Sequence, residues 1–165
     1  LVRQLRAKTS VPFEVHLMTD DPLAWIEPFA DAGANGIIFC LDSAREPARV
    51  IEAIKERGMF AGVSLLIDEG LDRIEPYWAD LDLVTIVGTA MGIKGASMDE
   101  CVPPKILAAR RIIQERGLTT EIEVDGGIRR NTVPLMAAAG ADWIVPGSLM
   151  FGEEPAEMRR WLATL

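Results

Sequence analysis

Short apolar runs alternate along this chain with segments whose apolar residues recur at helical spacing. Strands are predicted at residues 12–18, 36–41, 60–67, 83–87, 122–125 and 143–146. Helices are predicted between and after them, at residues 22–33, 46–57, 71–79, 103–116, 132–139 and 154–165. Residues 1–8 have the pattern of the second half of a helix, and the glycine-rich residues 88–99 predict a loop.

Regular alternation of strands and helices is typical of a parallel sheet built from βα units. We therefore expect an α/β fold with a single domain over residues 1–165. An open doubly wound sheet and a closed TIM (β/α)8 barrel both fit about six such units. The first strand does not lead into a G-x-G-x-x-G turn, whereas glycine turns follow the last two strands at Gly126-Gly127 and Gly147-Ser148. Phosphate sites of barrels frequently lie at those turns, so the barrel is favoured.

Composition narrows the classes of partner. The 165 residues are 49% hydrophobic and 25% charged, which is typical of a globular domain. A formal net charge of −8, without a basic cluster, argues against nucleic acid as a partner. No apolar run approaches the roughly 18 residues of a membrane span. Cys40 and Cys101 form neither a CxxC pair nor a disulfide framework, which predicts reduced thiols and a cytoplasmic protein.

Candidate chemistry begins at Asp125, which ends a predicted strand and precedes Gly126 and Gly127. Glycines at this position let a ligand approach the backbone closely. The predicted helix that follows offers N–H groups that suit an anion such as phosphate. A tight strand-to-helix turn with a solvated carboxylate fits the same three residues equally well.

Three segments of the chain, in matching order, resemble the motifs of one enzyme family. They are Val15-His16-Leu17-Met18 with the following Asp21-Pro22, then Glu123-Val124-Asp125-Gly126-Gly127-Ile128, and finally Gly147-Ser148-Leu149-Met150-Phe151. The family is that of the ribulose-phosphate 3-epimerases, whose third, seventh and eighth strands carry similar motifs. The order and spacing agree along all 165 residues.

The resemblance implies a TIM barrel of which this chain supplies strands three to eight. The first-strand serine and second-strand His-x-Asp segment of the family are absent, and a barrel without two strands would expose two unpaired edges. We therefore expect the first two strands upstream of Leu1, in a chain of about 210–230 residues. An intact mass close to 18.1 kDa for the purified protein would contradict this expectation.

The resemblance also implies an activity, the 3-epimerisation of a ketose phosphate through an enediolate. Two carboxylates would act as acid and base on opposite faces of the substrate, with a divalent metal between them. Asp125 would be one of these carboxylates and a metal ligand, His16 a second ligand, and the partner aspartate would come from the upstream strand. Zn, Fe, Mn or Co would suit such a site. Members of the family often self-associate, which suggests a homo-oligomer.

His16 and Met18 also have simpler explanations. His16 is the only histidine, and apart from the motif it would be interpreted as a buried structural residue. In a strand it shares its face with Glu14 and Met18, so that face is not purely apolar. The resemblance implies that Met18 shields the intermediate from water, and core packing explains Met18 equally well.

The expected phosphate site consists of the backbone N–H groups of Gly126, Gly127, Gly147 and Ser148, with the Ser148 hydroxyl as a further donor. The segment Gly92-Ile93-Lys94-Gly95 aligns with the family's substrate-covering flap. It departs from the flap where Ala90-Met91 replace Asn-Pro, Lys94 a glycine and Ala96 a glutamine. We expect Lys94 to reach the phosphate as a point charge, with a solvated loop lysine as the alternative.

Two further departures bear on the substrate. Cys40-Leu41-Asp42 stands where the family has His-x-Glu, and Leu65-Leu66-Ile67 where it has Leu-Asn-Pro. Ribulose 5-phosphate is therefore only the leading candidate, with related sugars such as allulose 6-phosphate beside it. Cys40 is expected to be a small pocket or core residue and not a nucleophile.

Two other functions fit the same residues. One is another phosphate-binding barrel enzyme, a decarboxylase or synthase, in which Asp125 acts without metal. The other is a barrel that binds a sugar phosphate or a partner without catalysis.

Overall fold

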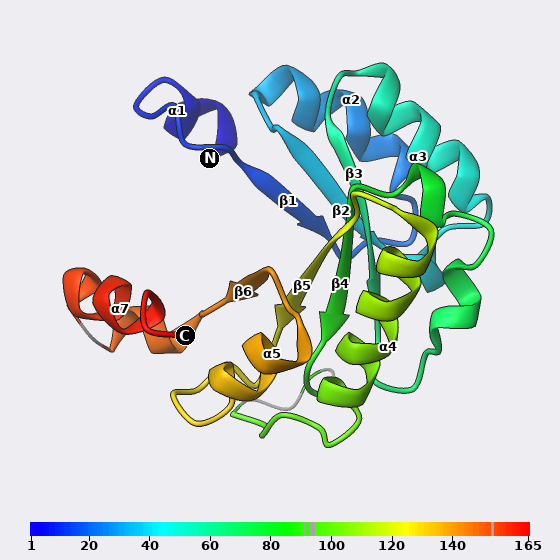
Figure 1. Ribbon diagram of the computed structural model, residues 1–165. Helices are drawn as coiled ribbons and strands as arrows, with labels where there is room; N and C mark the ends of the chain where they lie inside the picture. Colours follow the sequence, from blue (N-terminus) through cyan, green and yellow to red (C-terminus); the bar gives the residue numbers. More distant parts are fainter. Residues whose placement is uncertain (91, 93–94, 153) are drawn as a thin grey trace.

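The computed structural model describes residues 1–90, 92, 95–152 and 154–165 of the chain. These residues form one sheet of six strands, each parallel to its neighbour and in sequence order. The strands are β1 (Glu14–Leu17), β2 (Gly36–Cys40), β3 (Phe60–Leu65), β4 (Leu83–Val87), β5 (Glu121–Asp125) and β6 (Trp143–Val145). The sheet is curled, with β1 and β6 at its two edges (Figure 1). The α/β fold of about six βα units is confirmed.

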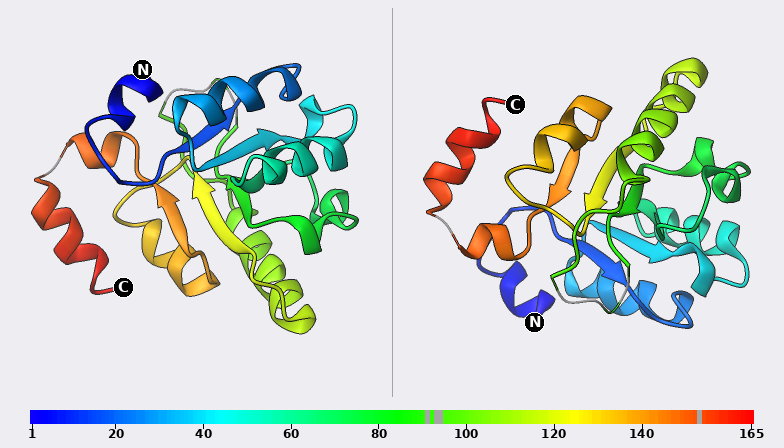
Figure 2. Two further views of the ribbon diagram at one scale, coloured as in Figure 1. Left: turned by 90° about the horizontal axis from the view of Figure 1, so that it is seen from above. Right: turned by 90° about the horizontal axis from the view of Figure 1, so that it is seen from below.

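The helices between the strands cover the convex face of the sheet (Figures 1 and 2). The α-helices are α1 (Val2–Arg6), α2 (Leu23–Ala32), α3 (Pro47–Glu56), α4 (Val102–Arg116), α5 (Val133–Ala139), α6 (Ser148–Phe151) and α7 (Pro155–Leu162). Three short 3-10 helices are η1 (Leu41–Ser43), η2 (Leu71–Ile74) and η3 (Trp78–Asp80). Among the residues that the structure describes, no helix is both long enough and apolar enough to cross a membrane.

The structure differs from the sequence-based prediction at two connections. The predicted helix at residues 71–79 is instead the pair of 3-10 helices η2 and η3. Pro76 lies between them, and a proline has no backbone N–H with which to continue the hydrogen bonds of a helix. The helix α6, which begins directly after Gly147, was not predicted, because its four residues are too few to show a period.

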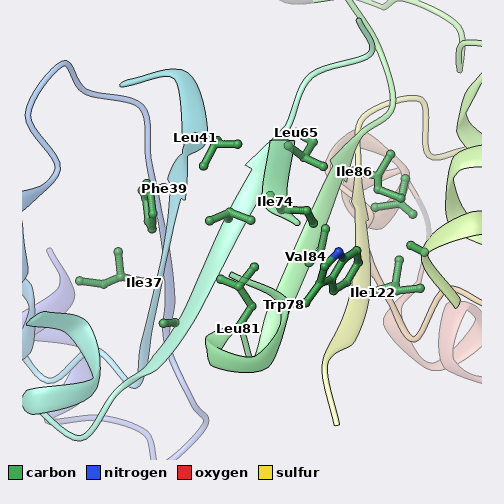
Figure 3. Close-up of a cluster of buried hydrophobic side chains, with 14 of the residues drawn as sticks. Ile37, Phe39, Leu41, Leu65, Ile74, Trp78, Leu81, Val84, Ile86 and Ile122 are labelled. Atoms are coloured by element: carbon green, nitrogen blue, oxygen red, sulfur yellow. The ribbon is translucent and has the colours of Figure 1, made fainter. Parts of the chain in front are cut away.

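The hydrophobic core lies between the convex face of the sheet and the helices (Figure 3). Side chains alternate between the two faces of a strand, so Ile37 and Phe39 of β2 point into this core while Cys40 points to the concave face. Trp78 closes the core from η3, with only 2% of its surface exposed. This packing fixes the position of the strand ends that carry the polar residues.

Candidate active site

The concave face of the sheet carries a group of polar side chains at alternate strand positions. They are Glu14, His16, Ser64, Thr85, Glu123 and Asp125. Parallel register places such residues on one face because paired positions of adjacent strands point the same way. The curl of the sheet then turns these side chains toward one another.

His16 and Asp125 meet across the concave face, although they lie on the non-adjacent strands β1 and β5. His16 Nδ1 is 3.7 Å from Asp125 Oδ2, and His16 Nε2 is 3.0 Å from Ser64 Oγ. The two side chains are 17% and 34% exposed. Burial lowers the pKa of His16, but the neighbouring Asp125 carboxylate and Cys40 thiol outweigh burial and raise this pKa to about 9. At neutral pH the imidazole is therefore a cation beside the Asp125 carboxylate.

Glu14 and Glu123 lie one pleat further from the strand ends on the same face. Thr85 Oγ1 donates to Glu123 Oε1 at 2.9 Å, and the Glu123 side chain is buried. Burial raises the pKa of Glu123, against the hydrogen bond from Thr85. Glu14 keeps access to solvent. Its pKa is nevertheless raised to about 7, first by partial burial against the concave face and then by the nearby charge of Glu123.

Cys40 is half-buried at the end of β2, beside the histidine. Its Sγ is 3.5 Å from Ser64 Oγ. The neighbouring His16 lowers the pKa of this thiol, with burial acting in the opposite direction. Cys40 therefore lies beside His16 and Ser64 on the concave face, and its role as a small pocket or core residue stays a prediction.

A cavity of about 210 Å³ opens at the carboxyl ends of β5 and β6, next to this polar group. Asp125 lines it together with the glycine turns that follow both strands. The lining residues are Thr89, Gly95, Ala96, Asp125, Gly126, Gly127, Ile128, Arg129, Val145, Pro146, Gly147 and Ser148. Five of the residues expected to bind phosphate, namely Gly95, Gly126, Gly127, Gly147 and Ser148, are therefore brought together around one space with Asp125.

The glycines of this cavity are held in close backbone contact with neighbouring loops. A Cβ atom on Gly88 would lie 2.2 Å from the carbonyl oxygen of Gly126, and one on Gly127 would lie 2.6 Å from the Cα of Met98. Gly126 and Gly127 also have positive φ, at 100° and 69°. The Gly88 N–H donates to the Asp125 carbonyl oxygen at 2.6 Å, which ties the end of β4 to this turn.

Three further residues were expected to bind the substrate, and none of them is found at this cavity in the described chain. Met18 follows β1, is 65% exposed and is not among the residues that line this cavity. Gly92 has a positive φ of 76° in the loop after β4 and also lies outside the lining set. Lys94 falls outside the described residues.

A divalent metal would find two suitable donors here. An imidazole and a carboxylate at the distance of His16 and Asp125 fit Zn, Fe, Mn or Co. Across residues 1–90, 92, 95–152 and 154–165, no group of three or more His, Cys, Asp and Glu side chains is arranged to hold a metal ion. His16 and Asp125 therefore fit two positions of a metal site and do not complete one.

Ser64, Thr85 and Arg129 belong to this region and were not predicted from the sequence. Ser64 and Thr85 are each flanked in the sequence by apolar residues of their own strand, so nothing in the pattern distinguishes them from core residues. Arg129 lies two residues after the Asp-Gly-Gly turn, and a cation at that place was an available signal.

Comparison with known proteins gives the family. The model of the ribulose-phosphate 3 epimerase family matches residues 1–151. The ribulose-phosphate 3-epimerase of Bacillus subtilis (strain 168) is 37% identical over 154 residues, which cover 93% of this chain and 71% of that protein. The cytoplasmic isoform of ribulose-phosphate 3-epimerase from Oryza sativa subsp. japonica is 32% identical, over 96% of this chain and 70% of that protein.

Among solved structures, a mutant tryptophan synthase alpha-subunit from Pyrococcus furiosus superimposes with a TM-score of 0.67. The match covers 87% of this chain and 59% of that chain, at 16% identity, and so supports the TIM-barrel type of fold alone. The family model and the curated relatives agree with the three motifs and with the curled parallel sheet. The chain belongs to the ribulose-phosphate 3 epimerase family.

Proposed function

We propose that this protein takes part in the 3-epimerisation of a ketose phosphate, with ribulose 5-phosphate as the leading substrate and allulose 6-phosphate as a related one. The observation that carries the proposal is the cavity in which Asp125 faces the glycine turns of β5 and β6. A carboxylate and an anion-binding turn on one small space are what proton transfer on a phosphorylated sugar requires. The names of the relatives support the same substrate class.

Binding of the substrate would begin at its phosphate. The backbone N–H groups at Gly126, Gly127, Gly147 and Ser148, with the Ser148 hydroxyl, are the donors we assign to that group. Their glycines permit the close approach that a side chain would block. Anchoring the phosphate there directs the carbon chain of the ketose along the cavity toward Asp125.

Asp125 would remove or return the proton at carbon 3. His16 lies beside it, with Nδ1 3.7 Å from Asp125 Oδ2, and a carboxylate is a suitable general base for this step. In the described chain, Asp125 is the one carboxylate that lines this cavity, and epimerisation requires a second acid or base on the opposite face of the substrate. Asp125 thus accounts for one of the two proton transfers.

His16 and Asp125 are also the residues that would hold a divalent metal, with His16 releasing its proton and binding as the neutral imidazole. Such an ion supplies positive charge that stabilises negative charge developing on the substrate oxygens. Ser64 contributes indirectly, because its hydroxyl contacts His16 Nε2 and so fixes the orientation of the ring. We further propose a cytoplasmic location, which the named isoform from Oryza sativa supports; the homo-oligomer stays a prediction.

The test is proton exchange at carbon 3. The protein is incubated in D2O with ribulose 5-phosphate or allulose 6-phosphate, with added Zn, Mn, Fe or Co and in parallel with chelator, and deuterium incorporation is followed by NMR. Exchange with one sugar that chelator abolishes is the expected result. Exchange that survives chelation would instead favour a barrel enzyme in which Asp125 acts without metal. Absence of exchange with either sugar under every metal condition would contradict the proposed reaction.

A further inference from the structure

Arg129 lines the candidate phosphate cavity, yet it belongs to none of the motifs that identify the family. Its side chain is half-buried, and its Nη1 donates to the carbonyl oxygen of Ile128 at 2.9 Å. The backbone around it is fixed by the buried Thr132. Thr132 Oγ1 accepts from the Arg129 N–H at 2.8 Å and donates to the Gly127 carbonyl oxygen at 2.7 Å. The guanidinium is therefore carried by a rigid turn and not by a freely moving loop.

The charge of Arg129 has no carboxylate partner among the residues that the structure describes. Several arginines elsewhere in the molecule do pair with carboxylates, as Arg110 does with Asp142 and Arg116 with Glu75. Asp125 lines the same cavity, but its recorded ion pair is with His16. Within the described residues, the one acceptor of the Arg129 guanidinium is a carbonyl oxygen. This leaves the charge of a half-buried cation incompletely compensated, and an anion in the cavity would compensate it.

We propose that the Arg129 guanidinium binds the phosphate group of the substrate, in addition to the backbone donors of the two glycine turns. This inference rests on the proposed function for the identity of the substrate, and on the cavity for its location. One Arg129 donor is used by the Ile128 carbonyl oxygen, and the planar fork presents further N–H groups that match phosphate oxygens. Arg129 would thus determine the preference for a phosphorylated sugar over the free sugar, while taking no part in proton transfer.

Arg130 provides a matched control because it carries the same charge one residue further along. It is exposed, its guanidinium lies 4.7 Å from the centre of the Trp161 ring, and it is not among the residues that line the cavity. Arg129→Met and Arg130→Met therefore remove the same charge and the same side-chain type from adjacent positions. Only the first change removes a group from the cavity.

The experiment measures the affinity for inorganic phosphate by isothermal titration calorimetry, and KM and kcat for the ketose phosphate. We expect Arg129→Met to weaken phosphate binding and raise KM by about 10- to 100-fold, the loss that follows removal of a charge-assisted hydrogen bond. The effect on kcat should be small. Arg129→Lys should bind with intermediate affinity because it keeps the charge and loses the fork, and Arg130→Met should match the unchanged protein.

Two outcomes would overturn the inference. One is equal phosphate affinity in the unchanged protein and the Arg129→Met variant, and the other is an unchanged protein that does not bind phosphate. Circular dichroism establishes that each variant is folded, and Arg129→Gln replaces Arg129→Met if the latter is not. A selective loss of phosphate binding in a protein that catalyses no exchange would defeat the proposed epimerase function and leave the assignment of Arg129 standing.

Discussion

Asp125 is the residue on which the proposed chemistry depends most directly. Replacing it in Asp125→Asn keeps the size and one acceptor oxygen but removes the group that would take the proton. We expect deuterium exchange at carbon 3 to fall by roughly 10²- to 10⁴-fold, the usual contribution of one general acid or base. Affinity for inorganic phosphate should stay within about 2-fold, because the expected anion donors are backbone N–H groups and Arg129.

Asp68 serves as the control for this change. It is an exposed carboxylate in the connection after β3 and is not among the residues that line the cavity. Asp68→Asn removes the same charge from the protein and should leave exchange unaltered. Equal exchange rates for Asp125→Asn and the unchanged protein would remove Asp125 from the mechanism.

At the residue scale, the motifs predicted which residues share the site, while the roles of these residues stay predictions. His16 and Asp125 were paired from their motifs, and the structure places them 3.7 Å apart. Ser64 could not be predicted in the same way, because a small polar residue inside an apolar run looks like any other buried strand position. Its relevance comes only from the curl of the sheet, which brings β1 to within hydrogen-bonding distance of β3.

At the scale of elements, the junction between β4 and the turn after β5 shapes the phosphate cavity. Gly88 has no room for a side chain, since a Cβ atom would lie 2.2 Å from the Gly126 carbonyl oxygen. Gly88→Ala should therefore push the two turns apart and lower the free energy of unfolding by about 1–3 kcal/mol, as overpacking does. Urea unfolding measures the loss, and phosphate titration of the folded variant should show weaker binding.

Gly152 is a suitable control for this substitution. It has a φ of −92°, which any residue adopts, and a Cβ atom there would lie 3.6 Å from its nearest neighbour. Gly152→Ala should leave the free energy of unfolding within about 1 kcal/mol of the unchanged protein, or raise it slightly. A Gly88→Ala variant as stable as Gly152→Ala would show that the turns can separate without cost.

A second element-scale prediction concerns Lys105 of α4, which holds the connection after β3. Its Nζ donates to the carbonyl oxygens of Leu66, Ile67 and Glu69 at 2.8, 3.0 and 2.8 Å. Lys105→Met leaves these acceptors without their donor and should cost about 1.5–3 kcal/mol of unfolding free energy. Hydrogen exchange of the amides in residues 66–70 should accelerate at the same time.

Arg111 lies on the same helix and is exposed, so Arg111→Met tests the general effect of placing methionine in α4. We expect it to change the free energy of unfolding by no more than about 0.5 kcal/mol. If Lys105→Met behaved in the same way, the three hydrogen bonds would contribute nothing to stability.

Elements themselves were predictable because each strand shows a compact apolar run and each long helix a clear period. All six strands were located, with ends that differ from the prediction by a few residues. The prediction of elements failed where the helices are only about one turn long. A proline separates η2 from η3, and the four residues of α6 are too few for periodicity to be visible.

At the scale of the whole molecule, the site is a product of curvature. His16 and Asp125 are four strands apart in the sheet order, so a flat sheet would hold them far from each other. Sequence patterns specify which residues share a face, but they do not specify how far a sheet curls. The family resemblance supplied that information, because a barrel brings the inner faces of distant strands together.

The proximity of His16 and Asp125, which depends on the curl of the whole sheet, gives a prediction about global stability. A ligand that binds only the folded protein stabilises it. A metal site made of His16 and Asp125 forms only when β1 and β5 are both in place. Zn or Mn at about 100 times its Kd should add about 2.7 kcal/mol to the free energy of unfolding. For a chain of this size that corresponds to a rise in Tm of roughly 5–10 °C.

Single changes at the two ligands separate this effect from non-specific metal binding. His16→Gln and Asp125→Asn should each lose most of the rise in Tm, because each removes one donor and leaves the other. Cys101→Ala should keep it, since this thiol contacts the Ile67 carbonyl oxygen away from the pair. An equal rise in all four proteins would place the metal elsewhere. No rise in Tm with either Zn or Mn would mean that the two donors bind neither metal in this chain, and Asp125 would then have to act as an acid or base alone.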